Sequence, residues 1–83
     1  MKWKWTAGQP IEADSMEAAA KVAARRLIKR HARNGIDLTP GRMLSLERSG
    51  QIPGVCVDYI ASACKGKQAF RVAFTMYDTN RGA

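Results

Sequence analysis

The sequence predicts an α+β fold in which one long, basic, amphipathic helix packs on one face of a mainly antiparallel sheet, in the order β-α-β-β-β. Three observations support this prediction. Lys2 to Thr6 alternates lysine with tryptophan, a pattern typical of a strand with one buried face. Residues 16–33 contain neither glycine nor proline and are rich in Ala, Leu, Lys and Arg, which favour helices. Three β-type segments with short connections follow, so an antiparallel meander is expected.

The length and composition indicate one globular domain, spanning residues 1–83. A hydrophobic content of 46% with 25% charged residues is ordinary for a folded chain with one modest core. No apolar run approaches the length of a membrane span, and the first ten residues lack the apolar centre of a signal peptide. We therefore expect a cytoplasmic protein without a membrane partner.

The first strand is expected at Lys2 to Thr6, with Trp3 and Trp5 facing the core. Gly8-Gln9-Pro10 predicts a turn, and Ile11 to Ala13 a short continuation of the strand before the helix. The two indoles would alternatively form a stacking platform for nucleic-acid bases, with the lysines nearby for phosphate. In so small a domain we favour the interpretation that they form the floor beneath the helix.

The helix is expected to run from Met16 to Arg33, about 27 Å at 1.5 Å per residue. Asp14 as N-cap and Glu17 three residues later form a capping-box pattern, and Asn34-Gly35 supplies a stop signal. At 100° per residue one broad side of the helix is apolar. This side consists of Met16, Ala20, Ala23, Ala24, Leu27, Ile28 and His31.

The opposite side of the helix accounts for most of the net charge of +7. Six of the 14 basic residues lie between positions 21 and 33, where there is no acidic residue. Such a face is either an ordinary solvated surface or a surface that meets phosphates or an acidic protein. Its basic residues are Lys21, Arg25, Arg26, Lys29, Arg30 and Arg33.

Two connections and one strand are expected after the helix. Ile36 to Thr39 leads into Pro40-Gly41, which is typical of a type II turn. Arg42 to Arg48 alternates imperfectly and is predicted to be a strand. Ser49-Gly50 and Pro53-Gly54 are expected to bracket a turn or loop.

The last two strands are predicted at Val55 to Cys64 and Gln68 to Tyr77. The first of these starts with β-branched and aromatic residues, which favours a strand over a short helix ending at Gly66. The 78–83 segment is polar and is expected to fray. On the core side of the final strand we place Phe70, Val72, Phe74 and Met76.

A second group of basic residues is expected around the final hairpin. Lys65 and Lys67 flank Gly66 in the connection, and Arg71 lies on the adjoining strand. Together with Asp58 and Thr75, Arg71 would face away from the helix, on a side of the sheet open to water or to a partner. The nine basic residues of the two groups are the predicted partner-binding residues.

No catalytic or metal-binding constellation emerges, so we expect no enzymatic activity, no metal and no cofactor. His31 is the only histidine, and the two cysteines lack Cys-x-x-Cys spacing. Cys56 and Cys64 would lie about 26 Å apart in one extended strand, so they are expected to be free thiols. A ribonuclease-type activity would require His31.

The helix entry, Ala13-Asp14-Ser15-Met16-Glu17-Ala18-Ala19, is of an ADS-x-EAA type. With its size, element order and composition, the chain resembles small phage-encoded proteins, including anti-CRISPR proteins that inhibit type I effector complexes. The resemblance implies a non-enzymatic blocker in a bacterial host cell, monomeric or weakly dimeric, that docks on a CRISPR effector ribonucleoprotein. Anti-CRISPR proteins are often acidic, whereas a basic chain would need an acidic protein surface or exposed nucleic acid as its target. The alternative is a nonspecific DNA- or RNA-binding protein that uses the same helix.

Overall fold

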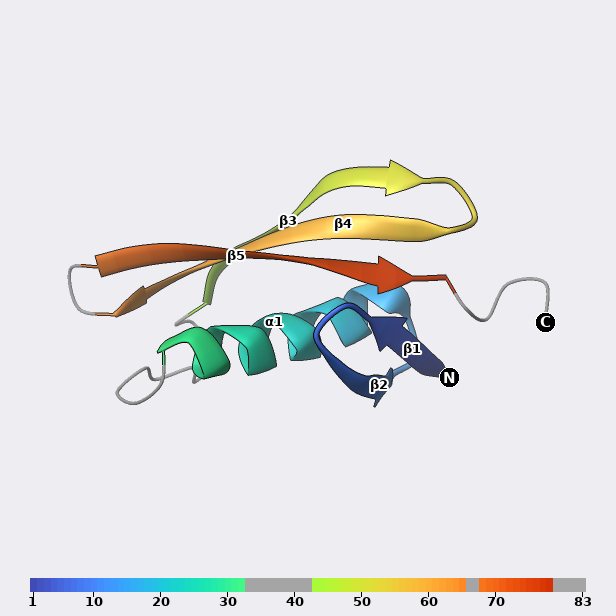
Figure 1. The fold of residues 1–83 in the computed structure, drawn as a ribbon, viewed down its shortest axis with the longest axis horizontal. Helices are drawn as coiled ribbons and strands as arrows, with labels where there is room; N and C mark the ends of the chain where they lie inside the picture. The colour runs from blue at the N-terminus through green and yellow to red at the C-terminus, as the bar shows by residue number, and fades with distance from the viewer. Residues whose placement is uncertain (33–42, 66–67, 79–83) are drawn as a thin grey trace.

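The computed structural model describes residues 1–32, 43–65 and 68–78, which form one helix and a five-stranded antiparallel sheet (Figure 1). An N-terminal hairpin precedes the helix, and a three-stranded meander follows it. Across the sheet the strand order is β2-β1-β5-β4-β3. The α+β class, with the basic helix on one face of an antiparallel sheet, is confirmed. The elements are β1 (Lys2–Trp5), β2 (Gly8–Glu12), α1 (Met16–Ala32), β3 (Met43–Ile52), β4 (Cys56–Lys65) and β5 (Gln68–Tyr77).

The N-terminal segment is a complete hairpin, whereas the sequence predicted one strand with a short continuation. Its turn lies at residues 6 and 7, and Gly8 already belongs to β2, so the expected turn at residues 8–10 was wrong. Gly8 serves packing instead, because a Cβ atom there would lie 2.7 Å from Cζ2 of Trp5. The glycine therefore allows the backbone to lie against the indole ring.

Both tryptophans belong to the core, as predicted. Trp3 and Trp5 are 8% and 5% exposed. Their indole N–H groups donate to the carbonyls of Ala13, at 3.1 Å, and Gln9, at 2.8 Å. Since a buried indole needs a hydrogen-bond acceptor, these bonds let the hairpin cover the core with aromatic rings that are not available to stack on bases.

The open end of the hairpin is tied by the first residue of the chain. The Met1 ammonium donates to Oε1 of Glu12 at 2.7 Å, and the Ala13 N–H donates to the Met1 carbonyl at 2.9 Å. The hydrogen bond from this ammonium, and then its positive charge, hold the pKa of Glu12 below its ordinary value.

The helix is capped by Ser15, one residue after the predicted cap. Ser15 Oγ accepts a hydrogen bond from the Ala18 N–H at 3.1 Å, and its carbonyl accepts the first helical bond from Ala19. These two bonds define the N-cap position, so Asp14 lies outside the helix. Glu17 does not close a capping box, because its carboxylate pairs with Arg48 at 3.4 Å. The predicted stop at Asn34-Gly35 lies outside the described residues.

We expect Ser15→Ala to lower the free energy of unfolding by about 1 kcal/mol, because the Ala18 N–H loses its partner. In a domain of this size the melting temperature should fall by about 4–8 °C. Asp14→Ala is the matched control and should be nearly neutral. A larger loss for Asp14→Ala than for Ser15→Ala in thermal unfolding would contradict the assignment of the cap.

Small side chains let the helix approach the sheet closely. Ala19, Ala20, Ala23, Ala24 and Ile28 are completely buried. Across the interface, ring stacking between Tyr59 and Phe74 places their centroids 5.6 Å apart, and Phe74 meets the edge of Trp5 at 6.0 Å. The predicted apolar side of the helix is confirmed for its described side chains.

Strand β3 is longer than the sequence predicted. Ser49-Gly50 lies inside the strand rather than in a turn, and the pairing with β4 shifts between Arg48 and Gly50. Such an irregularity is a β-bulge, which absorbs the extra residue without ending the strand. The turn comes at residues 53–55, where Gly54 has a φ of 76°.

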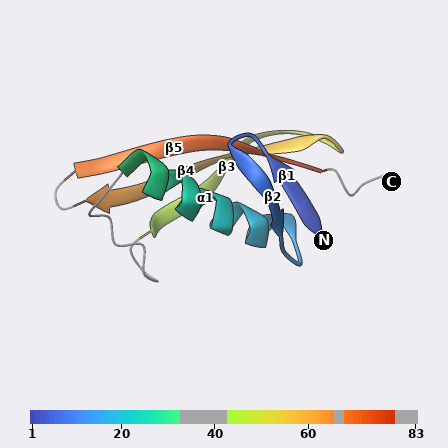
Figure 2. The ribbon, with the colours of Figure 1, turned by 60° about the horizontal axis from the view of Figure 1, so that its bottom comes forward.

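Residues on β4 and β5 alternate between the two faces of the sheet as predicted. Tyr59, Ala61, Val72 and Met76 are buried beneath α1, and the segment at residues 55–64 is a strand rather than a short helix. In Figures 1 and 2 the helix and the hairpin lie on the same side of the meander. Within the described residues, nothing covers its other side. The predicted turn at residues 40–41, the connection at residues 66–67 and the tail at residues 79–83 lie outside them.

Candidate functional site

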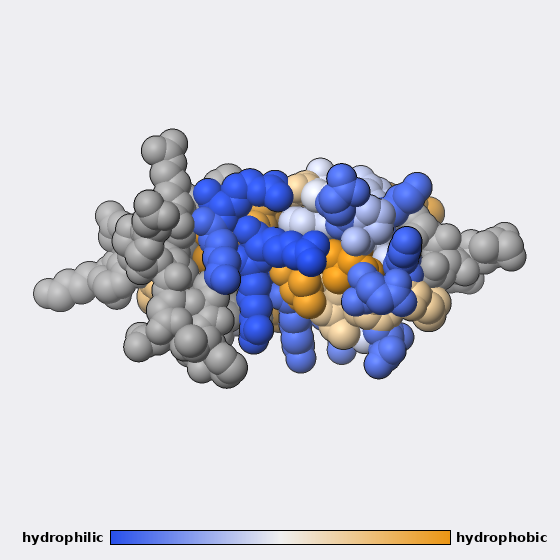
Figure 3. All heavy atoms as spheres, turned by 90° about the horizontal axis from the view of Figure 1, so that it is seen from below, coloured by the Kyte–Doolittle hydropathy of each residue, from blue (hydrophilic) through white to orange (hydrophobic). Residues whose placement is uncertain are grey.

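Five basic side chains are exposed along α1, on the side turned away from the sheet and at its margin. In the view from below, long hydrophilic side chains gather over the helix (Figure 3). Successive members of the series Lys21, Arg25 and Lys29 are one turn apart, which separates them by about 6 Å along the axis. Arg26 and Arg30 flank this series. The structure thus brings five of the nine predicted partner-binding residues onto one element.

Carboxylates do not neutralise this face within the part of the chain that the structure describes. Glu17 is the only acidic residue of α1, and it pairs with Arg48 of β3 instead of with Lys21. Lys21, Arg25, Arg26 and Lys29 form no ion pair with another described residue. Their charges repel one another, so an external anion would relieve this repulsion.

Arg30 differs from its neighbours because it has a partner inside the protein. Its Nη1 atom donates to the carbonyl of Ala7 at 2.6 Å, which ties the C-terminal half of the helix to the turn of the hairpin. The residue therefore anchors α1 as well as adding charge. This contact was not predicted, because it joins residues that are 23 positions apart in the chain.

Val22 is an apolar residue on the outward side of the helix, and it is 37% exposed. Helical spacing places it between Arg25 and Arg26, one turn further on. The sequence analysis did not single it out. Val22 therefore adds an exposed apolar group to the otherwise basic face.

The second predicted basic group does not join the first. Arg71 is exposed on β5 and points away from the helix, since its neighbour Val72 is buried in the core. Lys65 is the last residue of β4, while Lys67 and Arg33 lie outside the described residues. Among the predicted basic residues whose side chains are described, those of α1 therefore lie on one side of the sheet and Arg71 lies on the other.

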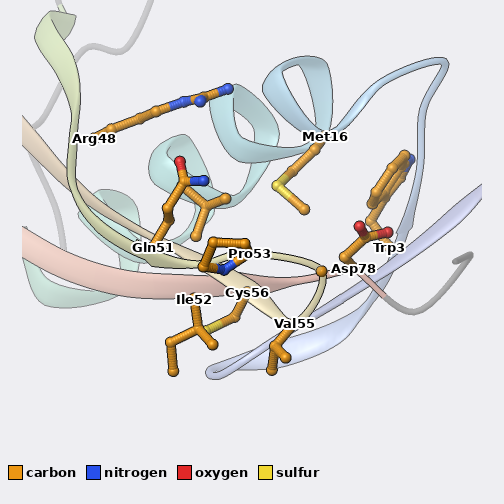
Figure 4. Close-up of a pocket in the computed structure, with 11 residues that line it drawn as sticks. Trp3, Met16, Arg48, Gln51, Ile52, Pro53, Val55, Cys56 and Asp78 are labelled. Atoms are coloured by element: carbon orange, nitrogen blue, oxygen red, sulfur yellow. The ribbon is translucent and has the colours of Figure 1, made fainter.

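A hollow of about 340 Å³ opens between the β3–β4 turn and the start of α1. Figure 4 shows Met16 and Gln51 projecting into the space above Pro53, while Ile52 and Val55 point to the other side of the sheet. Its lining combines apolar groups with Arg48, Gln51 and Asp78. Arg48 is engaged by Glu17, so the hollow offers no set of convergent charges.

A smaller hollow of about 190 Å³ lies between α1 and β3, lined by Lys21, Glu17, Arg48, Leu46 and Tyr59. The Tyr59 hydroxyl is buried without a hydrogen-bond partner among the described residues. A buried hydroxyl in this position is normally satisfied by water. Sequence reasoning missed both Arg48 and Tyr59 because this hollow depends on how the helix crosses the strands.

The two cysteines lie on β4, and the histidine lies near the end of α1. Cys56 is the first residue of β4, and Figure 4 shows its side chain with Ile52 on the side of the strands away from Met16, whereas His31 belongs to α1. Cys64 alternates with the buried Ala63 and so lies on the sheet face away from the helix. Both thiols are free, and no group of three or more potential metal ligands occurs among the described residues.

No protein-family model matches the chain, and no curated protein or solved structure shows significant similarity to it. In the described residues there is no helix both long enough and apolar enough to cross a membrane.

Proposed function

We propose that the chain is a non-enzymatic binding protein that contacts the phosphate backbone of nucleic acid through the outward face of α1. One observation carries the proposal. Lys21, Arg25, Arg26 and Lys29 share one exposed helical face and have no carboxylate partner among the described residues. Basic side chains arranged in this way release counterions when they neutralise phosphates, which drives sequence-independent binding.

The composition of the helix suits contact with the backbone and offers no amide side chain for reading adenine. Residues Met16–Ala32 contain neither asparagine nor glutamine, which pair with adenine in the major groove. Contacts from lysine and arginine to phosphate position a protein without specifying sequence. The proposal is therefore nonspecific binding with strong salt dependence.

Replacing Lys21, Arg25 and Lys29 together by alanine tests this proposal, because alanine preserves the helix while removing three charges. We expect the slope of log K against log salt to lose about 2–3 in magnitude for duplex DNA, with similar weakening for unrelated sequences. Fluorescence anisotropy at several salt concentrations measures the slope.

The matched control is Lys2→Ala with Lys4→Ala, which removes charge from β1 and should alter the slope much less. An unchanged slope in the triple variant, with its helix content intact, would contradict the proposal.

Inhibition of a type I CRISPR effector complex is a narrower proposal that uses the same face. It rests on the resemblance in size and composition, and such complexes contain RNA and bound DNA that would supply phosphates. A pull-down from bacterial lysate with a type I system distinguishes the two. Recovery of effector subunits after nuclease treatment supports the inhibitor, whereas recovery of mixed nucleic acid that nuclease abolishes supports general binding.

A further inference from the structure

The sheet face turned away from α1, here called the outer face, consists of five transverse rows of residues on β3, β4 and β5. Cross-strand register defines the rows, since directly paired residues point to the same side. From the β3–β4 turn to the far end, the rows are Ile52, Cys56 and Tyr77; Gly50, Asp58 and Thr75; Glu47, Ile60 and Ala73; Ser45, Ser62 and Arg71; Cys64 and Ala69.

Within the described residues, bulky apolar side chains lie at one end of the outer face and small side chains at the other. In the first row Ile52 is 58% exposed and Tyr77 is 37% exposed. Among the described residues, the fifth row contains Cys64 and Ala69. Ile60 lies in the middle row and is half-buried. A face that is large at one end and small at the other is complementary to a reversed copy of itself.

Asp58 and Arg71, which carry opposite charges, are also placed symmetrically about the middle row. Asp58 is in the second row and Arg71 in the fourth, so they lie on opposite sides of Ile60 and equally far from it along the strands. Thr75 Oγ1 donates to Asp58 Oδ1 at 2.6 Å, which orients the carboxylate. Beside this pair the face is hollowed by about 470 Å³, bordered by Ile60 and Ala73.

We propose that the outer face binds a second copy of this chain, sheet against sheet, about a two-fold axis that crosses the strands at the middle row. This axis places the first row on the fifth row of the other copy, and the second row on the fourth. Arg71 of each copy then enters the hollow beside Asp58 of the other, and Ile60 meets its own counterpart. Such an interface is isologous, as in most homodimers.

We favour the outer face over the free edge of β3 as the contact surface between the two copies. This edge carries Glu47 and Arg48 and the bulge at Ser49, which are features that disfavour pairing with another strand. Two stacked sheets pack about 10 Å apart with strands inclined by about 30°. Three strands of eight residues present about 400 Å² each, below the ~800 Å² per partner of a standard interface. The dimer is therefore weak and depends on concentration.

Sedimentation velocity across the micromolar range tests the proposal. The parent protein should show a concentration-dependent dimer, and Ile60→Asp should raise the dimer Kd by about 100-fold or more, because it places a carboxylate of each copy at the centre of the interface. Glu47 of the same row lies exposed on the edge strand β3, where its carboxylate can turn to water. Arg71→Asp should raise it about tenfold. The decisive variant combines Asp58→Arg with Arg71→Asp and should recover most of the affinity.

Rescue by this charge exchange reports contact between copies. Within one copy the two residues are four positions apart along adjacent strands, about 13 Å, and cannot pair. As a second measurement, Ile60→Cys in a Cys56→Ala, Cys64→Ala background should form a disulfide-linked dimer on oxidation, whereas Val22→Cys in the same background should not. A parent protein that stays monomeric, or a charge exchange that fails to rescue a folded variant, would overturn the proposal.

Discussion

Trp5→Ala is expected to remove about 3–5 kcal/mol of folding free energy, the usual loss for deleting a buried tryptophan. The side chain is 5% exposed, meets Phe74 edge-on, and donates its indole N–H to the Gln9 carbonyl at 2.8 Å. Total stability for a domain of 83 residues is about 4–12 kcal/mol. The variant should therefore lie near the limit of folding.

The loss should be large because Trp5 also attaches the hairpin to the meander. β1 pairs with β5 only at Trp5 and Met76, supplemented by two hydrogen bonds between Thr6 and Thr75. Urea unfolding followed by circular dichroism measures the effect. Trp5→Phe is the control. It leaves the Gln9 carbonyl without its donor, but it keeps an aromatic ring in the core and should therefore lose much less folding free energy. Equal losses for the two variants would contradict the role assigned to the ring.

Sequence patterns predicted the elements with long periodic signals. The helix has a capped entry and a continuous apolar stripe, and β5 alternates over its whole length. Alternation also placed Arg71 on the sheet face opposite the helix, because the next residue is the buried Val72. These features depend on residues close together in the chain, so a single sequence contains the information.

Local signals failed where two interpretations are chemically equivalent or where distant contacts decide. Asp14 and Ser15 are both good N-caps, and only the hydrogen bond from Ala18 distinguishes them. Ser49-Gly50 is typical of a turn, but pairing with β4 keeps it in the strand as a bulge. Gly8 does not form a turn. Its missing side chain instead leaves room for the indole ring of Trp5 on the opposite strand.

For the candidate surfaces too, sequence patterns predicted the residues of a single element but not the contacts between elements. Helical spacing alone predicted the series Lys21, Arg25 and Lys29. The partner of Arg30, the pairing of Glu17 with Arg48, and the positions of Asp58 and Arg71 about Ile60 required the tertiary structure. In each of these cases the relevant neighbour lies on another element, and its register is set by the packing of the whole sheet.

In a dimer joined through the outer faces, each α1 lies on the outside, and the two basic faces point in opposite directions. A dimer of this kind would hold two nucleic-acid segments at once. Linking two binding surfaces also raises the overall affinity when both are engaged.

We therefore expect the parent protein to bridge duplexes. A bead-bound duplex should capture a second, labelled duplex when the protein is added, and Ile60→Asp should abolish this capture while binding a single duplex with an unchanged salt slope. The triple alanine variant at Lys21, Arg25 and Lys29 should weaken both activities. Single-duplex binding by the parent without capture would contradict the dimer geometry, whereas absence of single-duplex binding would contradict the nucleic-acid proposal, so the two failures are distinguishable.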